Sequence, residues 1–480
     1  DQGKFVVSFA ESFGELGNGT LDYFLASVGD QVWLQPSGDL DLTGFAIESP
    51  FAKDLLDMVG VEPEMAEREE FKGVLSGFKH NQMPEPQRQN LQQLLDSWLG
   101  QIAAGIAASR DMAPDAVRQA INQAPYGARD GAAQGLIDEL GYWDQVTQAT
   151  LEQVGDDASF LDFFDYHAAV GSSDPTALAE GEVNTIALIY GLGPVTMGAS
   201  ENDPVFGDTV MGSDTVATAL SDAIDDPDIA AIVFRVDSPG GSYVASDTIW
   251  REVQRAREAE KPVILTMGNL AASGGYFVAA PATKIVAQPG TITGSIGVAA
   301  GKFDLSGLWD KLGVHWDVVK AGDNADLWSS TESFTDDGWD HLNASLDRTY
   351  ADFLNKVAQG RGFNDEEVRQ VAKGQVWTGA DALNLGLIDA LGGFDTAFAL
   401  ARSEAGLATD APLSIRRFPE PVDPFQALLE EFFLSEISAP LLRPLAGLAE
   451  SLRPWLSKLE QLSAGGPQPR LQWEPPQEAR

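Results

Sequence analysis

The sequence contains no cysteine and few histidines, which limits the chemistry that it can carry. Without cysteine, disulfides, thiolate nucleophiles and thiolate metal sites are excluded. No run of about 18 apolar residues occurs, so no transmembrane helix is predicted. The four histidines lack metal-ligand spacing to one another, so neither a metal site nor a histidine base is expected from His80, His167, His315 and His341.

Basic residues are also scarce. The chain has 31 Lys and Arg against 72 Asp and Glu, which gives a formal net charge of -41. An acidic excess of this size argues against nucleic acid and anionic lipid head groups as general partners. Because 44% of the residues are hydrophobic, the composition indicates a folded protein with a solvated acidic surface, of a kind that a saline habitat favours.

An internal repeat is the most informative pattern that is present. Residues 20–72 match residues 273–325 at an offset of 253, and the match resumes further on at an offset of 251. Two positions in this register differ in chemical character: Ser273 corresponds to Thr20, and Lys72 corresponds to Ala325. A duplicated enzyme that merges two sites into one would leave this pattern, with the lysine in one copy and the serine in the other.

The repeat also predicts the domain organisation. The first copy begins near Lys4 and lacks counterparts of about residues 183–256, so we interpret the chain as a truncated or processed product of a longer protein. The predicted parts are a truncated first repeat, a linker, a complete second repeat and a helical extension that ends in a disordered tail. Their ranges are residues 1–147, 148–182, 183–408 and 409–480.

The pattern inside the second repeat predicts an α/β layered domain. Residues 229–236 form a continuous apolar run typical of a buried parallel strand, residues 244–259 are helical, and residues 263–267 form the next strand. This alternation predicts a layered domain with crossover connections. In the extension, apolar stripes over residues 425–433 and 441–459 predict helices that contact the domain, a sister subunit or a membrane surface.

Ser273 is the candidate nucleophile. It follows an apolar strand and precedes Gly274 and Gly275, as expected at a helix N-terminus with free backbone N–H groups. A serine hydroxyl needs a neighbouring base, and without a suitable histidine the candidate is a neutral lysine. Burial between the two repeats would desolvate Lys72 and lower its pKa from about 10.4.

A second glycine turn follows residues 229–236. Gly240 and Gly241 would let a backbone N–H point at a bound carbonyl and form an oxyanion hole with the N–H of Gly274. Either glycine turn alone is most often an ordinary strand-to-helix connection. Together, one strand apart and beside a serine that the other repeat lacks, they favour a functional site.

Three motifs resemble the signal peptide peptidase A family in its long duplicated form: Ser-Pro-Gly-Gly-Ser at 238–242, Ala-Ala-Ser-Gly-Gly-Tyr at 271–276 and Thr-Gly-Ser-Ile-Gly-Val at 293–298. The resemblance implies two tandem ClpP/crotonase-like domains and a serine peptidase with a dyad of Ser273 and Lys72. It implies oxyanion donors at Gly240, Gly241 and Gly274, and a lysine-orienting role for Ser295. It further implies peptide substrates without any cofactor or metal, and a membrane-associated tetramer on the outer, periplasmic face of the bacterial plasma membrane that degrades remnant signal peptides.

The sequence departs from this family at one place, and two other functions stay open. Gly73 follows the lysine where the family commonly has Ser or Thr, and Glu69 and Glu70 would raise the lysine pKa unless they face solvent. A crotonase-type acyl-CoA enzyme shares the fold and the glycine turns, but it would carry acidic catalytic residues there. A catalytically inactive, membrane-associated assembly protein is the third reading.

Overall fold

The computed structural model describes residues 4–14, 17–155, 158–161, 166, 184–200, 209–318, 326–409 and 412–419. They belong to the compact unit Asp1–Pro419, and the fold below is the fold of that unit. Within these ranges no helix is both long enough and apolar enough to cross a membrane.

The first segment of the unit runs to residue 155 and contains a small parallel sheet covered by helices. Its elements are β1 (Val7–Ala10), α1 (Thr20–Ala26), β2 (Gln31–Leu34), β3 (Asp39–Leu40), α2 (Lys53–Val59), β4 (Glu62–Glu67), the 3-10 helix η1 (Gly73–Leu75), α3 (Ser76–Lys79), α4 (Glu85–Ser109), α5 (Pro114–Gln123), β5 (Tyr126–Gly127), α6 (Ala128–Ala133), β6 (Glu139–Leu140) and α7 (Trp143–Val154).

The second segment starts at residue 184 and contains the large sheet. Its elements are β7 (Asn184–Leu192), β8 (Val195–Thr196), β9 (Met211–Gly212), α9 (Ser213–Asp225), β10 (Ile229–Ser238), α10 (Tyr243–Glu258), β11 (Val263–Ala272), α11 (Gly274–Ala279), β12 (Lys284–Ala287), β13 (Ile292–Gly294), β14 (Ala299–Asp304), α12 (Ser306–Leu312), α13 (Asp336–Arg361), α14 (Asp365–Val371), β15 (Val376–Thr378), α15 (Gly379–Asn384), β16 (Ala390–Leu391), α16 (Phe394–Glu404) and β17 (Leu413–Phe418).

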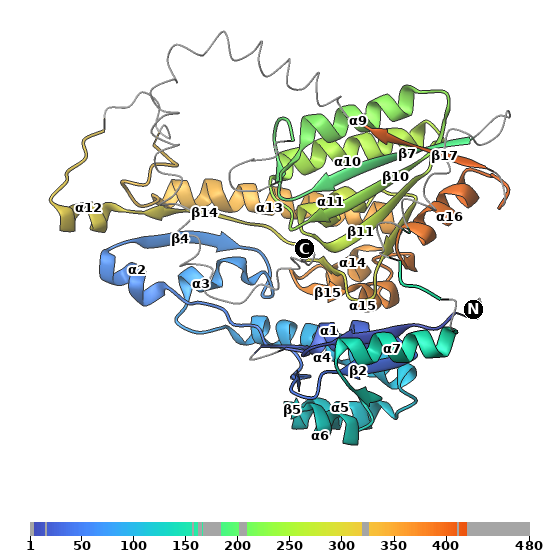
Figure 1. Ribbon diagram of the computed structural model, residues 1–480. Helices are drawn as coiled ribbons and strands as arrows, with labels where there is room; N and C mark the ends of the chain where they lie inside the picture. The colour runs from blue at the N-terminus through green and yellow to red at the C-terminus, as the bar shows by residue number, and fades with distance from the viewer. Residues whose placement is uncertain are drawn as a thin grey trace, which may run out of the picture. The chain divides into compact units, whose positions relative to one another are not determined.

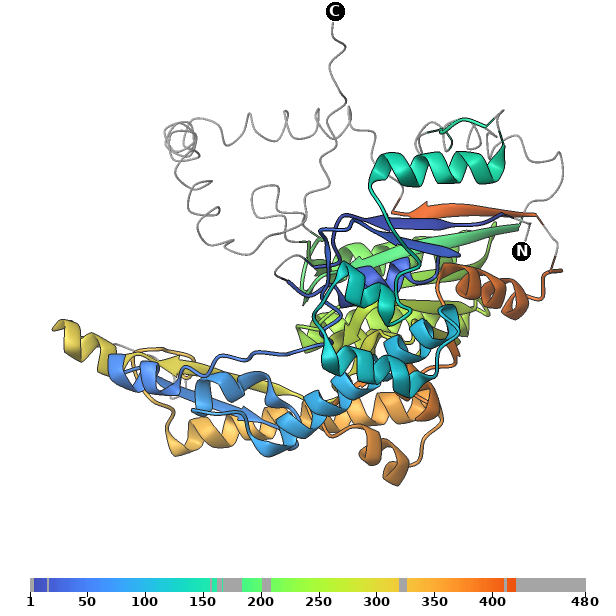
Figure 2. The same ribbon diagram turned by 60° about the horizontal axis from the view of Figure 1, so that its bottom comes forward.

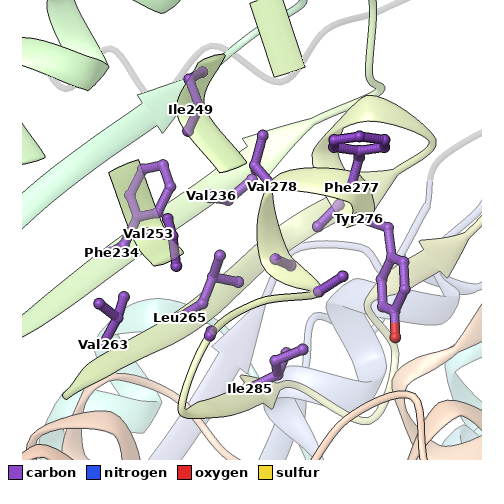
Figure 3. Close-up of a cluster of buried hydrophobic side chains, with 14 of the residues drawn as sticks. Phe234, Val236, Ile249, Val253, Val263, Leu265, Tyr276, Phe277, Val278 and Ile285 are labelled. Carbon is purple, nitrogen blue, oxygen red and sulfur yellow. The ribbon is translucent and has the colours of Figure 1, made fainter. Parts of the chain in front are cut away.

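The large sheet places β10 and β11 in its centre. Its strand order is β15-β13-β11-β10-β7-β17, and β12 pairs with β11 and β16. Alternate residues of β10 enter two cores: Phe234 and Val236 pack with α9 and α10, whereas Val233 packs with α16 on the opposite face. Figure 1 shows α9 and α10 on one side of these strands and α16 on the other, and Figure 3 shows the larger core around Phe234 and Leu265. The α/β alternation predicted for residues 229–267 is confirmed.

Corresponding elements of the two segments have the same neighbours. The parallel pairing of β1 with β2 and of β2 with β6 matches that of β11 with β12 and of β12 with β16. The hydroxyl of Tyr23 donates to the carbonyl of Leu136 at 2.7 Å, and the hydroxyl of Tyr276 donates to that of Leu387 at 2.8 Å. These are positions that the repeat register pairs, so the sequence correspondence extends to side-chain contacts.

The two segments are joined through strands and a helix that cross between them. Strand β4 of the first segment pairs antiparallel with β14 of the second. Helix α4 reaches the edge of the large sheet, where the amide of Asn90 donates to the carbonyl of Val376 and accepts from its N–H, both at 3.0 Å. Figures 1 and 2 both show β4 beside β14, which places the end of β4 next to the second segment.

The structure differs from two predicted domain limits. Helix α7 continues from Trp143 to Val154, so the limit at residue 147 lies inside a helix. Strand β17 lies in the range assigned to a helical extension, yet it pairs in parallel with β7 at the edge of the large sheet. The large sheet therefore includes residues up to Phe418. The predicted helices over residues 425–459 lie outside the described residues.

Candidate active site

Lys72 is placed by a loop of the first segment that is fastened to the second. The loop follows β4, and the lysine is the residue directly before η1. The Arg68 N–H donates to the carbonyl of Val298 at 3.0 Å, and the Phe71 N–H donates to that of Lys373 at 3.3 Å. These backbone bonds direct the lysine side chain into the second segment.

The Lys72 ammonium nitrogen contacts both serines that were singled out from the sequence. Nζ lies 3.1 Å from Ser273 Oγ, 2.9 Å from Ser295 Oγ and 2.8 Å from the Ser295 carbonyl oxygen. Three oxygen neighbours use the full donor capacity of an ammonium group and leave a neutral amine one lone pair for an incoming proton. The two segments thus bring Lys72 and Ser273 within hydrogen-bond distance.

Burial changes the acidity of this lysine. Lys72 is 7% exposed. This burial removes water from the amino group and lowers its pKa to about 8. Glu69 and Glu70, the carboxylates that would oppose this effect, are both exposed, and Glu70 lies 3.7 Å from the Lys373 ammonium group. The conflict noted in the sequence is therefore absent: the glutamates face solvent.

Two glycines make room for the lysine, and the sequence prediction did not include them. A Cβ on Gly374 would lie 2.7 Å from Lys72 Cβ, and a Cβ on Gly297 would lie 3.2 Å from Lys72 Cδ. Gly374 also has a φ of 79°, a conformation that favours glycine. The internal sequence match could have indicated Gly374, because the corresponding residue in the first copy is Gln123 and not a glycine.

Ser273 sits in a strained turn between β11 and α11. Its φ of 53° and ψ of -117° are unusual for a residue with a side chain, and its N–H donates to the Gly294 carbonyl at 2.9 Å. Ser295 also has a positive φ, of 51°, and its N–H donates to the Gln375 carbonyl at 2.8 Å. The main chain of both serines is therefore held by hydrogen bonds to the neighbouring backbone.

The glycine turn after β10 lies against the start of α11. A Cβ on Gly240 would lie 2.5 Å from the Gly274 nitrogen, and a Cβ on Gly274 would lie 3.1 Å from the Gly241 nitrogen. The Gly240 N–H donates to Ser238 Oγ at 3.1 Å, so the prediction of Gly240 as an oxyanion donor conflicts with the geometry. In the described part of the chain, the N–H groups of Gly241 and Gly274 donate to no protein acceptor.

These groups line one cavity of about 550 Å³. One wall is aromatic and aliphatic, with Phe277, Phe353 and Leu346, and the polar groups gather around Ser273. No acidic residue and no histidine is among the residues that line it, which are Lys72, Val74, Pro239, Gly240, Gly241, Tyr243, Ser246, Ser273, Gly274, Phe277, Ser295, Gly297, Val298, Ala299, Ala300, Ser345, Leu346, Thr349 and Phe353.

The matching position of the first segment has a structural role. Thr20 is fully buried, and its hydroxyl accepts from the Gly44 N–H at 2.9 Å. Ala325, the counterpart of Lys72, lies outside the described residues. Within the described ranges, no group of three or more potential metal ligands occurs.

Comparison with known proteins places the chain in a family. Protease 4 of Salmonella typhi is 33% identical over 85% of this chain, and the chloroplastic serine protease SPPA of Arabidopsis thaliana is 29% identical over 94%. The chain spans 65% of the length of each. A mutant of the 1510-N membrane-bound stomatin-specific protease aligns with 50% of this chain and 99% of its own at 15% identity and a TM-score of 0.30, too low to bear on the site. The model of Peptidase family S49 matches residues 1–155 and 255–408, more than half of the sequence, and the chain therefore belongs to peptidase family S49.

Proposed function

We propose that this chain is a serine endopeptidase in which Ser273 is the nucleophile and Lys72 the general base. The observation that carries the proposal is the 3.1 Å contact between Lys72 Nζ and Ser273 Oγ at a buried lysine with a lowered pKa. A base is most effective when its pKa lies near the working pH, and desolvation brings this lysine into that range.

The geometry supports a complete acyl-transfer cycle. Neutral Lys72 takes the hydroxyl proton as Ser273 Oγ attacks the peptide carbonyl carbon, and the N–H groups of Gly241 and Gly274 donate to the resulting oxyanion. When the C–N bond breaks, the Lys72 ammonium group gives its proton to the leaving amine. A water molecule then attacks the acyl ester, its proton passes to Lys72, and the acid product leaves as Ser273 regains its proton.

Ser295 is proposed as the residue that orients the base. Lys72 Nζ donates hydrogen bonds to the hydroxyl oxygen and to the carbonyl oxygen of Ser295. These two bonds orient the amino group so that its remaining position faces Ser273. Since Ser295 reaches the reaction through the lysine, we assign it a positioning role.

The proposed substrates are signal peptides that remain after their release from preproteins. An Enterococcus faecium relative, 32% identical over 40% of this chain, is named putative signal peptide peptidase SppA. The aromatic and aliphatic wall of the cavity, with Leu346 and Phe353, suits small or aliphatic side chains of such peptides. No cofactor and no nucleic acid enters the proposal.

The proposed architecture is a tandem repeat of two ClpP/crotonase-like domains, the first truncated at its N-terminus. The matching strand order and the paired Tyr23 and Tyr276 contacts support it. Association into a homo-oligomer, as a tetramer, and a place on the periplasmic face of the bacterial plasma membrane complete the proposal.

Two alternatives fit less well. A crotonase-type acyl-CoA enzyme would need acidic residues in the cavity, and the lining contains none. An inactive assembly protein would not need a buried lysine in contact with the serine.

The test uses single variants of the whole chain. Ser273→Ala and Lys72→Ala should each abolish peptide hydrolysis, and the double variant should be no slower than either, because the two residues act as one unit. Ser273→Ala should also lose labelling by serine-directed acylating inhibitors. The control variant Ser403→Ala, which changes an exposed serine on α16, should retain both peptide hydrolysis and inhibitor labelling. Hydrolysis by Ser273→Ala at the unaltered rate would overturn the assignment.

A further inference from the structure

A second cavity, of about 830 Å³, lies between the first segment and the large sheet. One of its walls comes from α1, α4 and the stretch after β3, and the other comes from β10, β11 and the turn between β12 and β13. Figure 1 shows α1 and α4 on the side of the sheet opposite α9 and α10. The reaction proposed above makes no use of this cavity, and none of its lining residues belongs to the catalytic cavity.

The first-segment wall of the second cavity corresponds to a wall of the catalytic cavity. Helices α4 and α13 begin at Glu85 and Asp336, an offset of 251, and the stretch from α1 onward is related to that from α11 by the offset of 253. In these registers, five of the six first-segment residues that line the second cavity correspond to residues that line the catalytic one. The pairs are Leu21 with Gly274, Phe24 with Phe277, Phe45 with Val298, Trp98 with Thr349, and Ile102 with Phe353. The first segment therefore has its own version of the proposed substrate cavity.

This version lacks the reactive groups of the catalytic cavity. Thr20, the counterpart of Ser273, is fully buried, and its hydroxyl accepts from the Gly44 N–H at 2.9 Å. Neither Thr20 nor any lysine is among the residues that line the second cavity. Its first-segment wall is instead aromatic and aliphatic, with Phe45 and Trp98 in edge-to-face contact at 5.8 Å. Such a cavity can bind an apolar chain without cleaving it.

Arg235 is the one charged residue among those that line the second cavity. Its Nη1 group donates to the Met267 carbonyl at 2.7 Å, and its Cζ atom lies 5.2 Å from the centre of the Phe394 ring. Across the described ranges it forms no ion pair with a carboxylate. Asp237, two residues further along β10, accepts backbone N–H groups of β11 instead. The remaining guanidinium donors are therefore available to an anionic group of a ligand.

We propose that the second cavity is a non-catalytic peptide site, which holds the apolar C-terminal end of a peptide with its terminal carboxylate on Arg235. The apolar wall suits the side chains, and a planar guanidinium group suits a carboxylate. The choice of ligand rests on the proposed function: hydrolysis of the acyl ester releases a peptide with a new C-terminal carboxylate. The site would therefore retain a product of the reaction that the catalytic cavity carries out.

Protection of a thiol tests occupancy of the cavity directly. Because the chain has no cysteine, Leu21→Cys places a single thiol on the cavity wall, and Leu25→Cys places one on the next turn of α1, outside the cavity. Leu21 and Leu25 are 60% and 75% exposed, so a maleimide should modify both thiols in the free protein. Both variants also carry Ser273→Ala, which keeps an added peptide intact.

The probe is an N-acetylated hexapeptide of alanine and leucine with a free C-terminal carboxylate. At about four times its dissociation constant it should slow modification of Leu21→Cys about fivefold, because only the unoccupied fraction reacts. Modification of Leu25→Cys should keep its rate. Equal rates for Leu21→Cys with and without saturating peptide would overturn the proposal.

The C-terminal amide of the same peptide tests the role of Arg235. The acid should bind at least about tenfold more tightly than the amide, because the amide loses the charge-assisted pair with the guanidinium group. In Arg235→Gln the two should bind equally. A merely structural loss would weaken acid and amide together and keep their ratio, so an unaltered ratio in Arg235→Gln, or equal affinities in the parent chain, would contradict the assignment.

Gly290→Trp tests the cavity without altering Arg235. A Cβ on Gly290 would lie no closer than 3.9 Å to its neighbours, which are Gln101 Oε1 and Trp98 Nε1, so an indole side chain can enter the cavity without a clash of its Cβ. Gly290→Trp should abolish the protection of Leu21→Cys. Gly127→Trp, an equal change at an exposed glycine with open space, should retain it. Protection that persists in Gly290→Trp would place the ligand elsewhere, and protection by laurate but not by the peptide acid would overturn the peptide as ligand.

Failure of the proposed reaction is distinguishable from failure of this site. Leu21, Arg235 and Gly290 lie outside the catalytic cavity. Thiol protection combined with a wild-type chain that hydrolyses no peptide would overturn the peptidase mechanism alone. An active wild-type chain combined with an unprotected Leu21→Cys thiol would overturn the second peptide site alone.

Discussion

Replacing Lys72 with methionine separates the energetic cost of burying the amino group from its proposed catalytic use. Methionine keeps most of the side-chain volume and removes the charge. Lys72 is 7% exposed, and its pKa is lowered from 10.5 to about 8 by desolvation. That difference in pKa corresponds to about 3 kcal/mol by which folding disfavours the charged amino group.

The pH dependence of this cost has a definite sign. Below pH 8 the amino group is protonated in both the folded and the unfolded chain, so the folded protein bears the full cost. Between pH 8 and 10.5 the folded lysine is neutral while the unfolded one still binds a proton, so the wild-type free energy of unfolding rises with pH relative to that of Lys72→Met. From pH 7 to pH 10, the difference between the two proteins should change by about 2 kcal/mol in favour of the wild type.

Urea unfolding followed by tryptophan fluorescence at several pH values measures this difference. Other titrating groups are common to both proteins and cancel in the comparison. Ser273→Ala is the matched control: it keeps the lysine buried, so its stability should follow that of the wild type across the same range. A difference between wild type and Lys72→Met that is constant from pH 7 to pH 10 would refute the desolvated-base argument.

Two further predictions concern activity. The wild-type kcat/KM for a peptide substrate should rise with pH as Lys72 loses its proton and level off above an apparent pKa of about 8, and a rate that is flat from pH 6 to pH 10 would point to a different base. Gly374→Ala should lower kcat about 100-fold or more, because its Cβ would displace Lys72. Gly362 also has a positive φ, of 71°, but there is open space around its Cβ position, so Gly362→Ala should lose only stability, about 1 kcal/mol in urea unfolding. Equal activity of the two glycine variants would contradict the close packing of Gly374 on the lysine.

The contact between Lys72 and Ser273 was predictable because the internal sequence match provides a register in which the two halves can be compared position by position. This comparison singled out Ser273, which corresponds to Thr20, and Lys72, which corresponds to Ala325. Ser273 and Lys72 are 201 positions apart in the chain, yet Lys72 Nζ lies 3.1 Å from Ser273 Oγ. Strands β10 and β11 were also readable, since buried parallel strands are continuous apolar runs.

Other features depend on tertiary contacts that no local pattern encodes. Strand β17, at the edge of the large sheet, has the sequence Leu-Ser-Ile-Arg-Arg-Phe. Apolar and polar residues alternate over only its first four positions, and this short pattern does not indicate which strand it pairs with. The Gly240 N–H was assigned to the oxyanion hole because its sequence context allowed it. Its actual partner, Ser238 Oγ, depends on the backbone conformation of the turn. In both cases the local sequence is compatible with more than one partner, and packing selects among them.

The lowered pKa of Lys72 links the candidate site to the contact between the two segments. Lys72 belongs to the first segment, but the groups that bury and hold it, Gly297, Gly374 and Ser295, all belong to the second. A lysine in the separated first segment would be solvated, with a pKa near 10.4, and would be protonated at neutral pH. The same ribbon of β4 and β14 that brings Lys72 to Ser273 would therefore set the fraction of lysine that is neutral. Any change that loosens this ribbon should raise the apparent pKa of the reaction before it unfolds either segment.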